Sequence, residues 1–191
     1  MPRPVSFRAI RLAFILGLAA LPVTAQDRAG NDTPGDWVVT HQAHFGLWDS
    51  VCDERPEQGQ THRRCYIRYV DVFSPRPDFA AHFLFVTPDG AGVRIEYGSE
   101  PGTRFAPGGQ WIERDGTRVW LADRLACLTG AACLYSGAAA GDLYAALKAG
   151  GQWRFLFADR HGRLQDLTWD LAPFAAAAAD FEAEAAARGL R

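Results

Sequence analysis

Long hydrophobic runs are nearly absent from this 191-residue sequence, and a single compact one lies near its start. It extends over residues 12–23, about 12 residues, whereas a helix that spans a membrane needs about 20. Basic residues precede it, and Val23-Thr24-Ala25 presents small side chains of the kind that signal peptidase recognises. This pattern predicts a secretory signal peptide over residues 1–25 rather than a transmembrane anchor. We therefore expect an exported mature chain with no transmembrane segment.

Excess basic charge is also missing. Arg3, Arg8 and Arg11 belong to the predicted leader, and without them 17 basic and 22 acidic side chains remain, a formal charge of −5. A mildly acidic domain lacks the positive surface that binding to nucleic acid requires, so no nucleic acid partner is expected. The remaining 166 residues suffice for one domain with a sizeable core. We assign residues 26–35, rich in turn formers, to a flexible lead-in and residues 36–191 to a single β-rich domain.

Sequence motifs of catalytic and metal sites are missing as well. There is no Gly-x-Ser-x-Gly nucleophile motif and no Cys-x-x-Cys redox motif. The four cysteines are spaced as C-x12-C and C-x5-C, unlike the close pairs of structural zinc sites. His41 and His44 stand three apart in a segment without helical character, which favours solvated or packed histidines over metal ligands. We therefore predict no catalytic residue, no cofactor and no metal.

The cysteines that are present, all in the expected mature part, indicate disulfide bonds. An even number of cysteines in an exported domain is typical of an oxidising compartment. Four cysteines allow three pairings, and loop geometry favours the local one, Cys52 with Cys65 and Cys127 with Cys133. The first pair brackets the polar residues 53–64, interpreted as a loop between two strands, and the second brackets a tight turn, LTGAA. Each bridge is expected to stabilise the fold by roughly 2–3 kcal/mol.

Short strands separated by turn signals dominate the rest of the sequence. Residues 66–73 are aromatic and β-branched, and residues 79–86 are apolar enough for a central strand. In residues 92–97 the apolar side chains alternate with Arg94 and Glu96, as in a strand with one buried face. These segments predict strands of an antiparallel sheet.

Two β-hairpins are expected from turn chemistry. Asp115-Gly116 lies between two runs of strand-forming residues, and both members of this dipeptide accept the positive φ of a tight turn. In the second hairpin, aromatic residues alternate over 153–157, the polar segment DRHG turns the chain, and apolar residues alternate again over 167–171. Such alternation predicts antiparallel strands with one face in the core.

Two helices complete the predicted fold. Residues 141–150 are expected to form a short helix, and the alanine-rich residues 172–188 a C-terminal helix that packs on a sheet. One face of the C-terminal helix carries Phe174, Ala178, Phe181 and Ala185. With about eight strands and no strand–helix repetition, the sequence predicts a mainly β fold, an antiparallel β-sandwich or barrel-like core with a short helix and a C-terminal helix.

Acidic pairs and tryptophans provide the alternatives to a purely structural chain. Asp53-Glu54, and Glu96 with Glu100, are candidate carboxylate pairs of a hydrolase, but acids in loops and on outer strand faces are usually solvated. Four of the six tryptophans lie in expected strands, where core packing is the common explanation and a sugar-binding face is the alternative. One such groove would combine Trp111 and Tyr97 with Arg94 or Arg114 at its rim.

Several of these motifs occur in an order that resembles the invasion-associated locus B proteins of Gram-negative bacteria. The signal peptide is followed by residues 45–53, FGLWDSVCD, in which a tryptophan leads to a cysteine, and by a cysteine that opens a strand at residues 65–67. A late cysteine pair, the aromatic strand and turn FLFADRHGRL, and a helix start at residues 171–175 complete the similarity. It covers about residues 36–185, and the chain is similar to a divergent member of this family.

The resemblance implies a periplasmic or outer-envelope β-sandwich without established catalytic residues, in a family of which some members are linked to host-cell invasion. We expect a non-enzymatic exported envelope protein, periplasmic, outer-membrane associated or secreted, that binds an envelope or host macromolecule. The alternatives are a small-ligand or glycan-binding sandwich and an envelope hydrolase with paired carboxylates. An exposed apolar patch would favour the first function, a solvent-facing tryptophan in a concave site the second, and two acids in one cleft the third.

Overall fold

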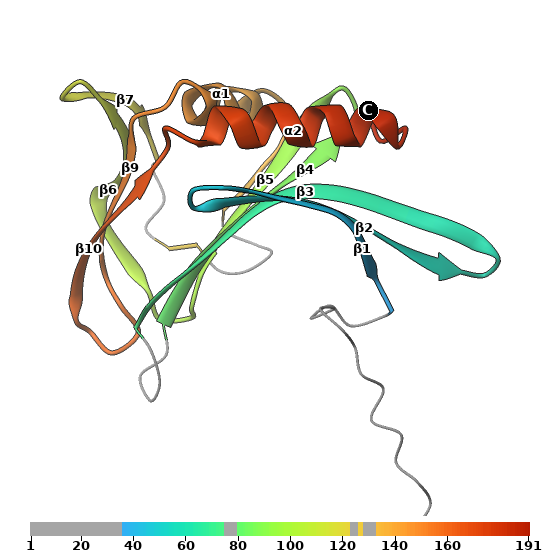
Figure 1. Cartoon of the computed structure of the whole chain (residues 1–191). Helices are drawn as coiled ribbons and strands as arrows, with labels where there is room; N and C mark the ends of the chain where they lie inside the picture. The colour runs from blue at the N-terminus through green and yellow to red at the C-terminus, as the bar shows by residue number, and fades with distance from the viewer. Residues whose placement is uncertain (1–35, 75–79, 123–125, 128–132) are drawn as a thin grey trace, which may run out of the picture.

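Alternating side chains and tight turns produce two antiparallel sheets in the computed structural model, which describes residues 36–74, 80–122, 126–127 and 133–191. The six-stranded sheet has the order β1 (Val38–Phe45), β2 (Trp48–Glu57), β3 (Gln60–Ser74), β4 (Ala80–Asp89), β5 (Gly92–Ser99), β8 (Leu134–Tyr135). The four-stranded sheet has the order β10 (Leu164–Asp170), β9 (Gln152–Ala158), β6 (Arg104–Arg114), β7 (Thr117–Leu121). Helix α1 (Gly137–Lys148) contacts β5 and β7, and α2 (Phe174–Ala187) runs across β1, β2 and β3 (Figure 1).

The core lies between the two sheets and beneath the helices. Tyr97 of β5 stacks on Phe155 of β9, with ring centroids 5.5 Å apart. Trp48 of β2 contacts Trp169 of β10 at 6.0 Å and Phe174 of α2 at 4.9 Å. All five side chains are fully or almost fully buried, so aromatic contacts join both sheets and the C-terminal helix into one core. The predicted β-sandwich is confirmed, and in the described residues neither sheet closes into a barrel.

The local predictions for the hairpins and for α2 are confirmed. Asp115 and Gly116 form the turn between β6 and β7, with φ of 50° and 73°. Residues 153–157 and 167–171 belong to the second hairpin, in which β9 and β10 are paired, although β10 ends at Asp170. The predicted face of α2 is buried in full, at Phe174, Ala178, Phe181 and Ala185.

The predicted start of α1 is wrong. The helix begins at Gly137 rather than Gly141, because Ala138, Ala139 and Ala140 favour helical backbone and Ser136 adopts the extended conformation of an N-cap. The helix therefore gains a first turn that the sequence analysis left out.

The interpretation of residues 53–64 as a loop is also wrong. Strands β2 and β3 continue through this segment to the two-residue turn Gln58-Gly59, where φ is 51° and 79°. The polar residues belong to a long hairpin that projects from the sheet (Figure 1). Opposite charges stand across the hairpin and stabilise its extended pairing, Asp53 against Arg64 and Glu54 against Arg63.

Both local cysteine pairs are joined. Cys52 and Cys65 are direct cross-strand partners in β2 and β3, with their Cα atoms 4.1 Å apart. Cys127 and Cys133 have Cα atoms 5.0 Å apart, and the turn predicted between them lies outside the described residues. The first bridge therefore joins two paired strands rather than the ends of a loop.

Removal of the Cys52–Cys65 bridge is expected to lower the free energy of unfolding by about 3 kcal/mol, because a closed loop of this length restricts the unfolded chain. The variant is Cys52→Ala/Cys65→Ala, measured by urea unfolding. Cys127→Ala/Cys133→Ala is the matched comparison. It removes the bridge that closes a shorter loop, so the expected loss is smaller, about 2 kcal/mol. A wild-type midpoint for the first variant would contradict the prediction.

Candidate functional site

The outer face of the six-stranded sheet carries apolar side chains. Strand alternation places Ile67 of β3 in the core and directs Tyr66, Val70 and Val72 to the opposite side. Val70 and Val72 are 50% and 48% exposed. Helix α2 packs on the core side, where Phe174 meets Trp48, so it does not cover these valines.

Two phenylalanines of β4 extend this apolar region. Phe83 and Phe85 are partly buried, with ring centroids 5.6 Å apart, and Phe85 lies 5.9 Å from the ring of Tyr66. Phe83 lies against Gly98 of β5, where any Cβ atom would collide with its ring. The result is a continuous apolar surface on β3 and β4. We call it the outer strip, defined as Tyr66, Val70, Val72, Phe83 and Phe85.

A buried carboxylate anchors the polar end of the outer strip. Asp53 accepts two hydrogen bonds from Arg64, at 2.6 and 3.0 Å, and one from the Tyr66 hydroxyl at 3.1 Å. The Arg64 guanidinium stacks on Trp37, 3.9 Å from the ring centroid. Burial raises the pKa of Tyr66, and the neighbouring Asp53 carboxylate raises it further. The phenol therefore stays a hydrogen-bond donor, and this end of the strip is rigid.

A group of polar side chains from β1, β2 and β3 also borders the strip. Asp49 accepts a hydrogen bond from Arg68 Nε at 3.3 Å, and its other oxygen is 2.5 Å from His44 Nδ1. Beside this group lies a hollow of about 420 Å³, lined by Leu47, Asp49, Arg68, Tyr69 and Val70. An apolar centre with arginine and carboxylate groups at its rim is the common composition of a protein interface.

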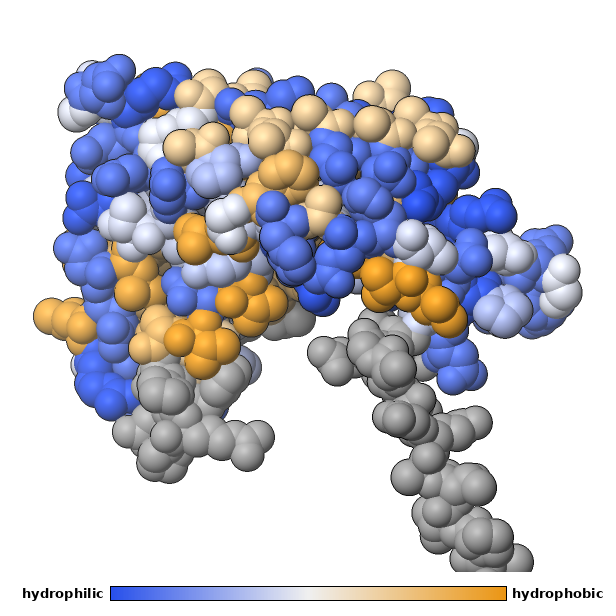
Figure 2. Space-filling view, in the orientation of Figure 1, coloured by the Kyte–Doolittle hydropathy of each residue, from blue (hydrophilic) through white to orange (hydrophobic). Residues whose placement is uncertain are grey.

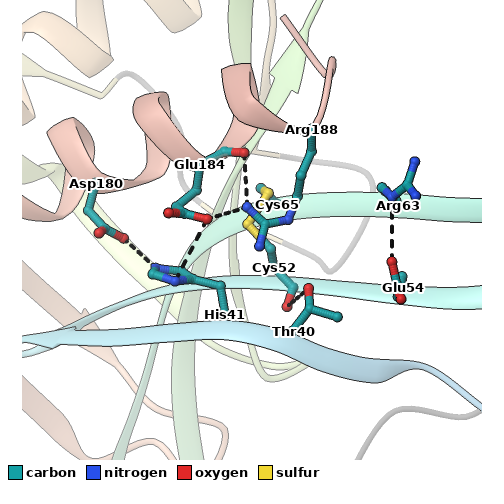
Figure 3. A network of polar contacts seen from close by, with 9 residues as sticks. All are labelled: Thr40, His41, Cys52, Glu54, Arg63, Cys65, Asp180, Glu184 and Arg188. Carbon is teal, nitrogen blue, oxygen red and sulfur yellow. Dashed lines mark hydrogen bonds and ion pairs between the residues drawn. A yellow bond between two sulfur atoms is a disulfide. The ribbon is translucent and has the colours of Figure 1, made fainter.

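A separate polar cluster lies between β1 and α2, where two acidic side chains approach one histidine (Figure 3). His41 Nε2 is 2.8 Å from Asp180 Oδ2, and its Nδ1 is 3.7 Å from Glu184 Oε2. Arg188 pairs with Glu184 in turn, and Thr40 donates its hydroxyl to the Cys52 carbonyl (Figure 3). Both ring nitrogens of His41 thus face carboxylates, and the contacts hold edge strand β1 on the helix.

Three of the four acids singled out in the sequence are bound to arginines. Asp53 is bound by Arg64, whereas Glu54 points to Arg63, with 3.4 Å between Oε2 and Nε. Glu100 forms its own ion pair with Arg160, at 2.7 Å. Within the described ranges, no group of three histidine, cysteine or acidic side chains has the arrangement of a metal site.

The alternative of a sugar-binding groove that combines Trp111 and Tyr97 does not fit the structure. Tyr97 is fully buried in the core, whereas Trp111 faces the outer side of the four-stranded sheet. The Arg118 guanidinium covers Trp111, 4.3 Å from the ring centroid. Trp37 is covered by arginine in the same way. Because arginine side chains cover Trp37 and Trp111, neither tryptophan offers an open stacking surface for a sugar.

The outer strip is not among the sites predicted from the sequence. The sequence feature that could have indicated the strip is the run of residues 79–86, in which apolar side chains occupy both faces of the expected strand. That pattern was interpreted as a central strand, and β4 is central in its sheet. One of its two apolar faces nevertheless lies on the outer side of the sandwich, at Phe83 and Phe85.

Comparisons with known proteins give limited similarity. No protein-family model matches the chain, and no curated protein matches it. Among solved structures, the crystal structure of invasion associated protein B from Bartonella henselae is similar, with a TM-score of 0.45 and 13% sequence identity. The match covers 75% of this chain and 96% of the Bartonella chain. We draw no functional argument from it, and membership of the invasion-associated locus B family stays a prediction from the sequence.

Proposed function

We propose that this chain is a non-enzymatic, exported envelope protein that binds a macromolecular partner through the outer strip. The observation that carries the proposal is an apolar surface of neighbouring side chains on β3 and β4, on the face opposite α2. Contiguous apolar patches on a folded domain mark interaction sites more often than scattered single residues do.

Export is supported by the two disulfide bonds. Such bonds persist in oxidising compartments, and the predicted signal peptide leads to the same conclusion. In the part of the chain that the structure describes, no helix is long and apolar enough to cross a membrane. We propose the periplasm as the compartment, with outer-membrane association or secretion as the alternatives.

The polar surroundings of the strip support a protein partner. Arginine, tyrosine and tryptophan are the residues most enriched where interfaces gain their binding energy. Tyr66 belongs to the strip, and Arg64 and Trp37 adjoin it. The ion pair of Arg64 with Asp53 holds these rings in place before any partner arrives. A partner would therefore meet a largely preformed surface.

Charge placed on the strip is expected to abolish partner binding. Val70→Lys/Val72→Lys introduces two cations at exposed strand positions, which would have to lose water in the complex. Mature protein, residues 26–191, carrying a cross-linker would be incubated with an envelope extract, and bound proteins identified by mass spectrometry. We expect one dominant partner with the wild-type protein and at least a tenfold loss with the double lysine variant.

The matched control adds the same charge away from the strip. Val119→Lys/Leu121→Lys alters two apolar residues of similar exposure, both on β7 of the four-stranded sheet, and is expected to keep the partner. Equal losses for both double variants, or no dominant partner with the wild-type protein, would reject the outer strip as the binding site. A chemically reduced sample tests whether the bridged shape is needed.

A further inference from the structure

A second apolar depression lies on the other sheet. It has a volume of about 420 Å³ and is formed where β6, β9 and β10 run side by side, with Ala106, Leu156, Ala158 and Leu164 among its lining residues and Arg104 at its border. Pockets for small ligands have volumes on the order of 300–1,000 Å³. We call this depression the β6–β10 groove. It is separate from the outer strip, which lies on the six-stranded sheet.

An irregularity in β6 creates the space for this groove. Phe105 pairs with Phe157 and Gln110 with Phe155, so four residues of β6 stand opposite Leu156 alone. Gly109 makes this possible, because a Cβ atom there would collide with the Leu156 carbonyl oxygen. A bulge of this kind bends the strand and redirects its side chains, and bulges are frequent next to functional sites.

The groove exposes leucines that a folded domain would ordinarily bury. Leu164 is 84% exposed and Leu156 is 41% exposed, and both line the groove. Figure 2 shows apolar side chains at the left edge of the molecule, beside β10. Neighbouring exposed leucines in a concave site favour an apolar ligand that would remove them from water.

The charge at the groove is positive and uncompensated. Among the arginines in the described ranges, Arg104 alone has a side chain without a hydrogen bond, ion pair or ring contact. The other cations nearby are neutralised, since Arg160 pairs with Glu100 and Arg163 with Asp159. Among the described residues that line the groove, none carries a carboxylate. A guanidinium without a side-chain partner, among the lining residues of an apolar groove, fits a carboxylate that carries an apolar tail.

We propose that the β6–β10 groove binds a free fatty acid, with the carboxylate on Arg104 and the acyl chain against Leu156 and Leu164. One guanidinium can hold one carboxylate through two parallel hydrogen bonds, which fits a monoanionic head group. The apolar lining accepts an unbranched chain without requiring further polar contacts. This activity is independent of the partner surface on the six-stranded sheet.

The test is titration of the mature protein, residues 26–191, with dodecanoate by calorimetry. We expect saturable binding at one site. Arg104→Glu is expected to weaken it about tenfold or more, because the head group would meet a like charge. Leu164→Ser is expected to weaken it several-fold, since the chain would lose apolar contact. Both side chains are exposed, so neither variant is expected to unfold the domain.

Three comparisons make the result decisive. Arg94→Glu makes the same charge change on β5 and is expected to leave dodecanoate binding unchanged. Dodecyltrimethylammonium has the same chain with a cationic head and is expected not to bind. Val70→Lys/Val72→Lys, which tests the outer strip, is expected to bind dodecanoate as the wild type does. No saturable binding, equal losses for Arg104→Glu and Arg94→Glu, or binding of the cationic amphiphile would overturn the proposal.

Discussion

The free energy of unfolding is expected to fall by about 1.4 kcal/mol for each pH unit as the pH drops from about 6.5 to about 3, through His82 alone. His82 is fully buried on β4, and its Nδ1 lies 2.6 Å from the Tyr97 hydroxyl. The ring of Phe157 is 4.4 Å away, and in the described part of the chain Nε2 has no hydrogen-bond partner. Burial among aromatic rings lowers the pKa of His82 to about 3.

The sign of this pH dependence follows from the number of protons that the folded and the unfolded states bind. Below pH 6.5 an unfolded histidine takes up a proton, whereas the folded His82 does not until about pH 3. The unfolded state therefore binds more protons in this window, and acid favours it. The contribution of His82 is complete above the unfolded pKa, and about 5 kcal/mol of it is lost when the pH reaches the folded pKa.

The measurement is a set of urea titrations from pH 7 to pH 4. His82→Gln removes the titrating group but keeps a side chain that can accept a hydrogen bond from the Tyr97 hydroxyl. The slope of the free energy of unfolding against pH should therefore be smaller than in the wild type by about 1.4 kcal/mol per pH unit. His62→Gln makes the same substitution on the solvated β2–β3 hairpin and is the control for the exchange itself. If His82→Gln keeps the wild-type slope, this account of the core is wrong.

Replacement of Trp169 by alanine is expected to lower the free energy of unfolding by about 3–5 kcal/mol. Trp169 lies at the centre of the aromatic core, with ring centroids 4.6 Å from Phe155 and 5.0 Å from Tyr69. Its indole N–H donates to Asp71 Oδ2 at 2.7 Å. Alanine would leave a cavity between the two sheets and would also remove the hydrogen-bond donor of Asp71.

A second substitution separates these two contributions. Trp169→Phe retains most of the ring volume but lacks the N–H, so its expected cost is smaller, about 1–3 kcal/mol. Circular dichroism during urea unfolding provides the readout, because tryptophan fluorescence changes with the substitution itself. A loss below about 1 kcal/mol for Trp169→Ala would show that the core relaxes into the space, contrary to the packing described here.

The parts of the fold that could be predicted from sequence were those with a local cause. Positive φ at Asp115 and Gly116 determines the β6–β7 turn within two residues. The alternation of apolar and polar side chains over residues 92–97 predicts which face of the strand is buried. Val93 and Ile95 are in the core, as this pattern indicates. Composition was misleading in the β2–β3 hairpin, because polar residues suit a solvated strand as well as a loop. The pairing of β2 with β3 shows that these polar residues form strands and not a loop.

The candidate site depended on contacts that no local pattern contains. Phe83 and Val70 come from different strands, and only the pairing of β3 with β4 places them together on one face. Whether that face was buried depended on which side the helices and the second sheet would cover. The placement of Arg104 without a carboxylate partner, as seen in the described residues, likewise arises from the positions of β6, β9 and β10.

The sequence by itself determined the antiparallel β character and the buried face of α2, and it favoured the local pairing of the cysteines, because each depends on residues close together in the chain. The export signal stays a prediction from the sequence. Only the tertiary structure decided which apolar face stays outside the sandwich, which arginine lacks a partner, and that His82 is enclosed by aromatic rings. Burial is a property of the assembled layers, and the same strand pattern can face the core or solvent until its neighbours are in place.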